Sequence, residues 1–337
     1  MSIRLIQLRK GVERAVAWVE EPHLRLLAAT ESIYALATES LERRTELSSL
    51  AGEKATGEVL DYDSVYEGGS EWRILPSIDH PDEAARCLVS GTGLTHLGSA
   101  RDRQSMHSHN SGSDENLTDS MKMFGWGRDG GRPLAGEIGV SPEWFFKGNA
   151  AGLRAHNEFL EIPGYAEDGG EEAEIAGVYL ISPQGQPVRI GMTQGNEFSD
   201  HAFEKRNYLY LASSKLRNCA IGPELVIDPE FDSVPGQVSI TRDGHCVWSK
   251  PIRTGEAEMC HSLRNIEHHH FKFAGHRRPG DIHVHFLGAD CLSFGEGVRL
   301  GPGDLIQIRF EGFGRPLRSG VSAAEAPSQL VSVTALK

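Results

Sequence analysis

The chain of 337 residues has few cysteines, no long apolar run near its start and no block of basic residues. Its five cysteines are scattered and form no CxxC pair, which is typical of reduced thiols in a cytoplasmic protein. Charges interrupt residues 1–21 every few positions, so we expect neither a secretory signal nor a membrane span. A net charge of −13 without Lys/Arg runs disfavours nucleic acid as a partner.

No segment repeats at a fixed period, which disfavours solenoids and propellers. Alternating apolar residues predict strands over residues 3–8 and 14–19, and irregular helical spacing predicts a surface helix over residues 30–50. After residue 140, short strand patterns outnumber helical ones. The predicted class is α+β and mostly β; the pattern itself supports the many short strands, and the family resemblance described below implies the rest.

The most informative stretch covers residues 171–224, which begins with alternating charges. Glu172 and Glu174 alternate with Ala173 and Ile175, so on a strand the two carboxylates share one face. Two like charges side by side repel each other unless an arginine or a metal ion lies between them.

A third carboxylate follows on the returning strand. Residues 178–181 continue the first strand, a Pro/Gly turn spans 182–187, and residues 188–192 return and bring Glu197 towards the first pair. Carboxylate oxygens suit a hard cation such as Mg²⁺, Mn²⁺ or Ca²⁺ better than zinc. The alternative is a solvated strand face paired with lysines. Ser199 is the expected N-cap of a helix over 201–211.

The order of several motifs resembles the signature of the fumarylacetoacetate hydrolase superfamily. E-x-E-I-A is followed by a hairpin, then G-M-T-Q-G-N-E-F-S-D, then A-S-S-K ahead of I-G-P. The resemblance covers residues 145–321. It implies a divalent metal on Glu172, Glu174 and Glu197. Glu197 stands where the family usually has Asp, and His201 where many family hydrolases have Arg.

An earlier glycine-rich turn after a predicted strand resembles the family's G-x-N-Y-x-x-H-x-x-E segment. Aligned on Gly93, the chain has His96 at the Tyr, Ser99 at the His and Asp102 at the Glu. The water-activating histidine of the family's hydrolases is then absent. A shifted alignment would instead let His96 or His107 take that role.

The resemblance also divides the chain. Residues 101–118 are polar and are expected to form a mobile loop or lid, or else a plain linker. A glycine-rich connection is expected over 125–136, and F-F-K resembles the entry strand of the family's catalytic domain. The expected parts are a smaller N-terminal α/β domain over residues 1–125 and a mixed β-roll, metal-binding catalytic domain over residues 126–337, assembled as a homodimer.

Three adjacent histidines, residues 268–270, lie in a segment with helical spacing. Neighbouring helical positions point about 100° apart, so we do not expect all three to bind one ion. An Asp-Gly turn predicts a hairpin over 237–248, and alternation predicts a strand over 282–286.

The segments E-M-C-H-S, E-H-H-H-F-K and L-S-F-G-E-G resemble the sugar-acid branch of the superfamily. This implies an Mg²⁺-dependent dehydratase of a 2-keto-3-deoxy-pentonate in non-phosphorylative pentose breakdown, acting through a metal-bound enolate on a small 2-oxo acid. The alternatives are a hydrolase that cleaves a C–C bond of an acylpyruvate and a non-catalytic sugar-acid-binding regulator.

The resemblance also implies roles for particular residues. It assigns a catalytic role to Lys215, His201 and Ser99, substrate contacts to His96, Arg101, Lys147, Glu204, Ser214 and Ala289, and metal ligation to Glu172, Glu174 and Glu197.

Overall fold

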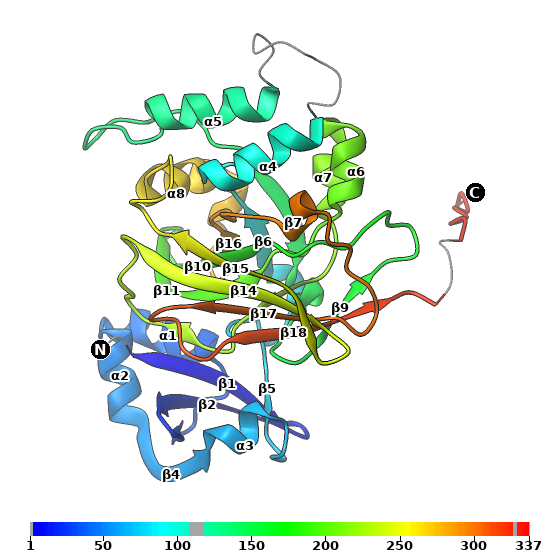
Figure 1. Cartoon of the computed structure of the whole chain (residues 1–337). Coiled ribbons are helices and arrows are strands. Elements are labelled where there is room, and N and C mark those ends of the chain that lie inside the picture. The colour runs from blue at the N-terminus through cyan, green and yellow to red at the C-terminus, as the bar shows by residue number, and fades with distance from the viewer. Residues whose placement is uncertain (1–2, 108–117, 326–328, 337) are drawn as a thin grey trace.

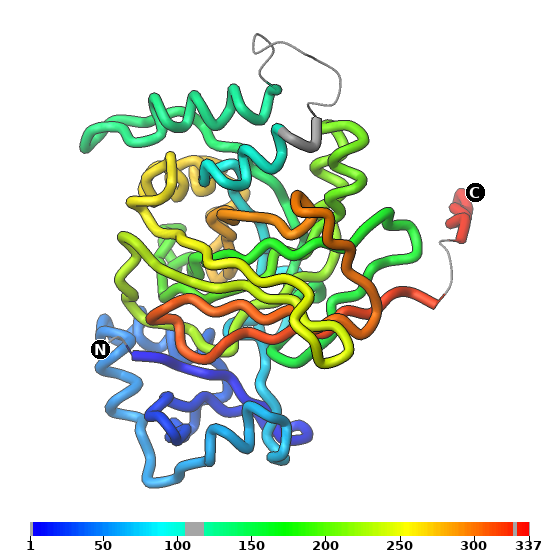
Figure 2. The backbone as a smooth tube through the Cα atoms, viewed as in Figure 1, coloured from blue at the N-terminus to red at the C-terminus, as the bar shows by residue number. Residues whose placement is uncertain are grey.

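The computed structural model describes residues 3–107, 118–325 and 329–336. Within these residues the strands form one sheet of 13 strands and a second sheet of five. Figures 1 and 2 show the N-terminal strands at one end of the molecule, the two sheets in the middle and helices α4 and α5 at the other end. The predicted class, α+β and mostly β, is confirmed.

The N-terminal part is an antiparallel meander with three helices. Its elements are β1 (Arg4–Lys10), β2 (Glu13–Glu20), β3 (His23–Leu27), α1 (Ile33–Arg43), α2 (Leu47–Lys54), β4 (Ala55–Asp61), α3 (Tyr62–Tyr66) and β5 (Arg73–Ile74). The strands predicted over residues 3–8 and 14–19 are confirmed. The single helix predicted over 30–50 is wrong, because the left-handed backbone of Arg44 (φ 52°) ends α1 before α2 begins.

The middle of the chain builds the large sheet and the helices above it. Its elements are β6 (Cys87–Gly91), α4 (Leu97–His107), α5 (Asp119–Gly130), β7 (Phe145–Asn149), β8 (Leu153–Arg154), β9 (Phe159–Ile162), β10 (Ala173–Ile181), β11 (Pro187–Asn196), α6 (His201–Arg206), α7 (Leu211–Ser214), β12 (Cys219–Ile221) and β13 (Leu225–Val226). The hairpin predicted after residue 171 is thus confirmed as β10 and β11.

The last third supplies most of the second sheet. Its elements are β14 (Val234–Arg242), β15 (His245–Thr254), α8 (Leu263–Phe271), β16 (Ile282–Phe286), β17 (Leu305–Phe310) and β18 (Leu317–Ala323). The predicted hairpin over 237–248 and the strand over 282–286 are confirmed as β14–β15 and β16.

Ten strands of the large sheet run in the order β4-β3-β2-β1-β13-β11-β10-β16-β6-β7. The other three lie off this path: β5 pairs with β1, and β12 pairs with β11 and β8. The second sheet runs in the order β15-β14-β17-β18-β9. The N-terminal meander therefore continues the sheet that carries β10 and β11. Apolar side chains from both sheets, such as Ile175, Val238 and Ile308, form one core cluster. The division at residue 125 stays a prediction.

Two segments predicted to be irregular are helical. Helix α4 covers residues 101–107 of the expected polar loop, so that prediction is wrong there, and residues 108–117 lie outside the described residues. Helix α5 extends to Gly130, where a glycine-rich connection was expected. Its glycines allow close packing instead of ending the helix: a Cβ on Gly127 would lie 2.6 Å from His261 Nε2.

The predicted helix after β11 is also divided. Asp200, not Ser199, is the N-cap, because its Oδ1 accepts a hydrogen bond from Phe203 N at 2.9 Å. Extended backbone at Asn207 (φ −162°) separates α6 from the turn that leads into α7. In the part of the chain that the structure describes, no helix combines the length and the apolar character needed to cross a bilayer.

Candidate metal centre

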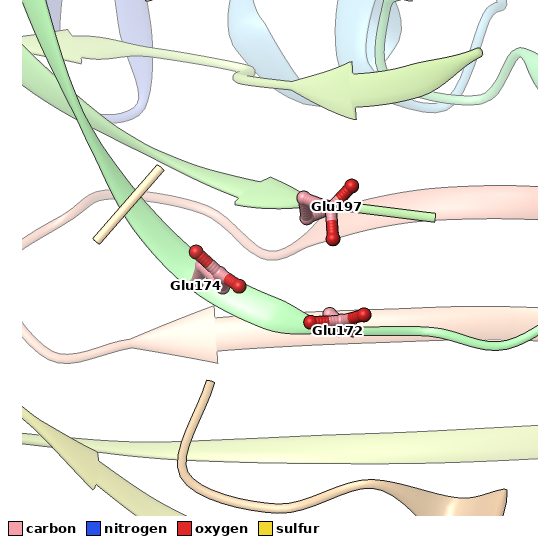
Figure 3. A group of neighbouring side chains, drawn as sticks. All are labelled: Glu172, Glu174 and Glu197. Atoms are coloured by element: carbon pink, nitrogen blue, oxygen red, sulfur yellow. The ribbon is translucent and has the colours of Figure 1, made fainter. Parts of the chain in front are cut away.

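Three glutamates meet where β10 begins and β11 ends. Glu172 precedes β10, Glu174 lies in it, and Glu197 follows β11; the antiparallel register opposes Glu174 to Gly195. One carboxylate oxygen from each lies within 4.8 Å of the others (Figure 3). The structure therefore brings together the residues expected to bind metal, while their role as ligands stays a prediction.

Each carboxylate is buried and held by a neutral donor or an imidazole. Glu174 Oε2 accepts a hydrogen bond from Gly288 N at 2.7 Å, and Glu197 Oε2 accepts one from Ser199 Oγ at 2.9 Å. His201 Nε2 donates to Glu172 Oε1 at 3.0 Å. Gly288 has φ +101°, a backbone conformation that favours glycine. These contacts fix the direction of the oxygens.

Two buried lysines neutralise part of the cluster. Lys147 Nζ lies 2.6 Å from Glu197 Oε1 and donates to the carbonyl oxygens of Phe198 and Lys215. Lys215 Nζ contacts Glu172 Oε1 and lies 2.6 Å from Glu197 Oε2. Lys215 thus lies beside the carboxylates as expected, and Lys147, expected only as a substrate contact, lies there as well. Whether they touch substrate stays a prediction.

A second layer of charge surrounds the lysines. Ser214 Oγ donates to Glu204 Oε1 at 2.6 Å, and Lys215 Nζ lies 3.5 Å from that oxygen. Arg103, on α4, lies 3.7 Å from Glu204 Oε2 and 3.0 Å from Glu143 Oε1. Both oxygens of Glu143 accept from Arg103 Nη1. Helix α4 is therefore connected to the centre by ion pairs.

Arg103 and Glu143 were missed at the level of sequence. Arg101 was expected to touch substrate, but its side chain is exposed on α4, whereas Arg103 is buried. The structure places Glu143 against Gly93, where a Cβ would lie 1.9 Å from Glu143 Oε1. That glycine was aligned with the family motif, but its close neighbour, 50 positions away, is not visible in the pattern.

The electrostatics of the cluster fit an additional cation. Burial raises the pKa of the Glu174 carboxyl well above its usual range, and the charges of Glu172 and Glu197 raise it further. Burial also opposes ionisation of Glu172, but the Lys215 ammonium, the hydrogen bond from His201 and the charge of Arg103 together outweigh it and hold the pKa of Glu172 well below its usual range. When all of them are ionised, carboxylates still outnumber cations among the linked side chains: Glu143, Glu172, Glu174, Glu197 and Glu204 against Arg103, Lys147, Lys215 and His201. Burial opposes protonation of His201, but its hydrogen bond to Glu172 and the charge of Glu172 raise its pKa.

An oxygen donor set with excess negative charge suits a hard divalent cation. The residues present therefore fit the metal that the motif implies. Glu172, Glu174 and Glu197 would hold it.

The remaining predicted site residues lie around α4 and after β16. His96 is buried, and its Nδ1 lies 2.8 Å from Thr95 Oγ1, whose hydroxyl donates to Leu287 O. Ser99 Oγ donates to the carbonyl oxygen of His96. Ala289 is buried in a small apolar cluster. Contacts of these residues with a substrate stay predictions.

The histidines of α8 have packing partners. Trp144 Nε1 donates to His270 Nδ1 at 3.1 Å, so the Nε2–H of His270 faces His283 Nδ1 at 2.9 Å. His269 Nε2 lies 3.0 Å from Gly139 O. These contacts attach α8 to β16 and to the segment that precedes β7.

Solved structures of enzymes match the fold of almost the whole chain. A structure named 2-keto-3-deoxyarabinonate dehydratase matches with a TM-score of 0.69 and 19% identity over 96% of this chain and 99% of the other. The chain has the fold of that dehydratase. The fold that the sequence resemblance implies is thereby confirmed.

Two further matches support the fold. A 2-keto-3-deoxy-D-arabinonate dehydratase complexed with magnesium and 2,5-dioxopentanoate matches with a TM-score of 0.68 and 19% identity, over 95% of this chain and 99% of the other. A 2-hydroxyhepta-2,4-diene-1,7-dioate isomerase from Mycobacterium marinum matches with a TM-score of 0.59 and 16% identity, over 96% of this chain and 100% of the other.

A relative found by its sequence also bears the name of a 2-keto-3-deoxy sugar-acid dehydratase. It is a probable 2-keto-3-deoxyxylonate dehydratase of Haloferax volcanii, 28% identical over 180 residues. The match spans 51% of this chain and 58% of the relative. No family model matches the chain.

Proposed function

We propose that this protein is an Mg²⁺-dependent dehydratase of a 2-keto-3-deoxy sugar acid, a pentonate, in non-phosphorylative pentose breakdown. The observation that carries the proposal is the buried group of Glu172, Glu174 and Glu197, with oxygens within 4.8 Å of one another. The fold shared with a dehydratase that was solved with magnesium and 2,5-dioxopentanoate supports the same reaction.

The chemistry follows from the charges around the cluster. Mg²⁺, when bound, would supply a Lewis acid for the C1 carboxylate and C2 carbonyl oxygens of a 2-oxo acid. Lys215 places a positive charge where negative charge develops on the C2 oxygen as the C3 proton leaves. Loss of the C4 hydroxyl together with the C3 proton removes water and leaves a double bond between C3 and C4. Transfer of a hydrogen from C5 to C3 gives an enol at C4–C5, and transfer of its hydroxyl proton to C4 leaves an aldehyde at C5. The product of a 2-keto-3-deoxy-pentonate is 2,5-dioxopentanoate.

Hydrolysis of an acylpyruvate is less well supported by the geometry. Hydrolysis needs a base that activates water, and in the family this is a histidine paired with a glutamate. Ser99 occupies the aligned position and donates to a backbone carbonyl, while His96 Nδ1 faces Thr95. The side chain of His107, the other alternative, lies outside the described part of the chain.

The test is turnover with defined sugar acids. Purified protein with Mg²⁺ is incubated with 2-keto-3-deoxyarabinonate and with 2-keto-3-deoxyxylonate, and mass spectrometry follows the loss of 18 mass units and the appearance of 2,5-dioxopentanoate. Chelation with EDTA should abolish the product, and added Mg²⁺ should restore it. Cleavage of an acylpyruvate with both sugar acids intact would make the protein a hydrolase. Tight binding of either acid without turnover would make it a binding protein.

The proposal also includes a cytoplasmic homodimer. Its mass in solution is measurable by size-exclusion chromatography with light scattering, and a monomer at micromolar concentration would contradict that part of the proposal.

A further inference from the structure

The position of Lys215 raises the question of how a cation reaches the carboxylates. Both oxygens of Glu197 already contact an ammonium, Oε1 from Lys147 and Oε2 from Lys215, each at 2.6 Å. Lys215 also contacts Glu172 Oε1. A Mg²⁺ ion binds carboxylate oxygens at about 2.1 Å. Such an ion would therefore lie next to an ammonium in a buried site, where repulsion between like charges is strong.

The two lysines differ in what else holds them. Lys147 donates to the backbone carbonyls of Phe198 and Lys215, which fixes its ammonium in place. Lys215 Nζ instead has carboxylate neighbours, Glu172 and Glu197 close by and Glu204 further away, and lies 4.8 Å from the centre of an aromatic ring. Of the two, Lys215 is the one that can change partner.

Glu204 is placed to receive that ammonium. Its Oε1 lies 3.5 Å from Lys215 Nζ and accepts a hydrogen bond from Ser214 Oγ, and its Oε2 lies 3.7 Å from Arg103. Neither cation makes a close ion pair with this buried carboxylate. A shift of Nζ by about 1 Å would bring it within charge-assisted hydrogen-bond distance of Oε1.

We propose that Lys215 and a divalent cation exchange places: when the cation binds, the Lys215 ammonium moves from Glu172 and Glu197 to Glu204. Glu204 is then a positioning residue for Lys215 and not, as expected from the sequence, a substrate contact. This inference rests on the proposed function, because it takes the carboxylate cluster to be a metal site. It makes Lys215 a competitor of the metal, and it makes Glu204 the side chain that relieves the competition.

A double-mutant cycle on metal affinity tests the exchange without any sugar acid. Mn²⁺ and Mg²⁺ are titrated calorimetrically into the wild type, Glu204→Gln, Lys215→Met and the double variant. We expect Glu204→Gln to raise the Kd roughly tenfold and Lys215→Met to lower it roughly tenfold. In the Lys215→Met background, Glu204→Gln should change the Kd less than about threefold. Glu167→Gln, which removes a carboxylate that pairs with Arg206 on α6, is the matched control and should keep the wild-type Kd.

Two outcomes of the cycle would overturn the inference. If Glu204→Gln weakens binding equally in both backgrounds, Glu204 acts on the cation through its charge alone. If Lys215→Met weakens binding, Lys215 supports the metal instead of competing with it.

A crystal structure of the wild type with Mn²⁺ gives an independent test should a variant fail to fold. We expect Nζ of Lys215 within about 3.2 Å of Glu204 Oε1. An ammonium still in contact with Glu172 and Glu197 beside the bound ion would refute the exchange. If Lys215 moves to Glu204 when the metal binds but no sugar acid is dehydrated, the proposed function is wrong and this inference stands. If a sugar acid is dehydrated but Lys215 does not move, the proposed function stands and this inference is wrong.

Discussion

At the scale of single residues, the centre owes its properties to burial. Glu174 is 1% exposed and Glu197 is fully buried, so their charges are poorly screened by solvent. Neutral donors such as Gly288 N orient the oxygens but do not cancel their charge. The lysines cancel part of it, and the resulting balance favours uptake of a cation.

Replacing Glu174 by glutamine should separate metal binding from folding. The amide removes repulsion with Glu172 and Glu197 but also removes one anionic ligand. In EDTA we expect the melting temperature of Glu174→Gln to equal or exceed that of the wild type, while the Kd for Mg²⁺ rises on the order of 100-fold, about 3 kcal/mol. Differential scanning calorimetry with and without Mg²⁺ measures both effects. Glu161→Gln, on the exposed side of β9, is the control. A clear loss of stability in EDTA would show that Glu174 mainly supports the fold.

At the scale of elements, α4 is joined to the centre through one buried side chain. Arg103 reaches Glu143, which precedes β7, and Glu204 on α6. Tyr208 OH donates to Glu143 as well. The helix has few apolar residues, so these polar contacts explain why a segment that looks like a loop in the sequence is helical.

Replacing one partner of the Arg103–Glu143 ion pair should destabilise the protein more than replacing both partners. Arg103→Leu leaves the buried Glu143 carboxylate without its cation, and we expect a loss of about 3–5 kcal/mol in the free energy of unfolding. The double variant Arg103→Leu/Glu143→Gln removes both charges and should recover at least about 1 kcal/mol of that loss. Urea unfolding followed by circular dichroism measures the difference. Equal losses in the single and double variants would mean that packing, and not the ion pair, holds α4.

At the scale of the whole molecule, buried histidines link stability to pH. Burial lowers the pKa of several of them below the usual 6.5: to about 4 for His96, His156 and His261, and to about 3 for His283 and His285. Between pH 6.5 and about 4 the unfolded chain binds protons that the folded chain does not. The contribution of these histidines to stability is therefore complete above pH 6.5 and is lost as the pH falls.

We expect each of these histidines to contribute a fall of roughly 1.4 kcal/mol per pH unit in the free energy of unfolding across this window. Buried carboxyls with raised pKa values, such as Glu174 and Glu197, contribute in the opposite direction. His156 offers a specific check, because it stacks on Tyr66 at 4.1 Å and connects α3 to β18 through Arg318 N. His156→Gln should remove one titrating group and so reduce the slope of the unfolding free energy against pH by roughly 1.4 kcal/mol per pH unit in this window. Urea midpoints at pH 7, 6 and 5 measure it, and an unchanged slope would contradict the assignment.

The strands and the three glutamates were predictable because they depend on local order in the chain. Alternation places Glu172 and Glu174 on one face, and a short Pro/Gly turn requires β11 to return beside β10 and bring Glu197 close. The Asp-Gly hairpin and the class of fold follow from similar local patterns. No distant residue is needed for these conclusions.

The partners of that cluster depend on contacts between distant parts of the chain. Arg103 meets Glu143 and Glu204 because α4 packs against α6, and those residues lie 40 and 101 positions away. Alternation and spacing carry no information about such long-range contacts, so the sequence does not distinguish the exposed Arg101, which was predicted to contact substrate, from the buried Arg103. The position of the Lys215 ammonium is also a tertiary property, since it is the sum of attractions from three carboxylates on separate elements.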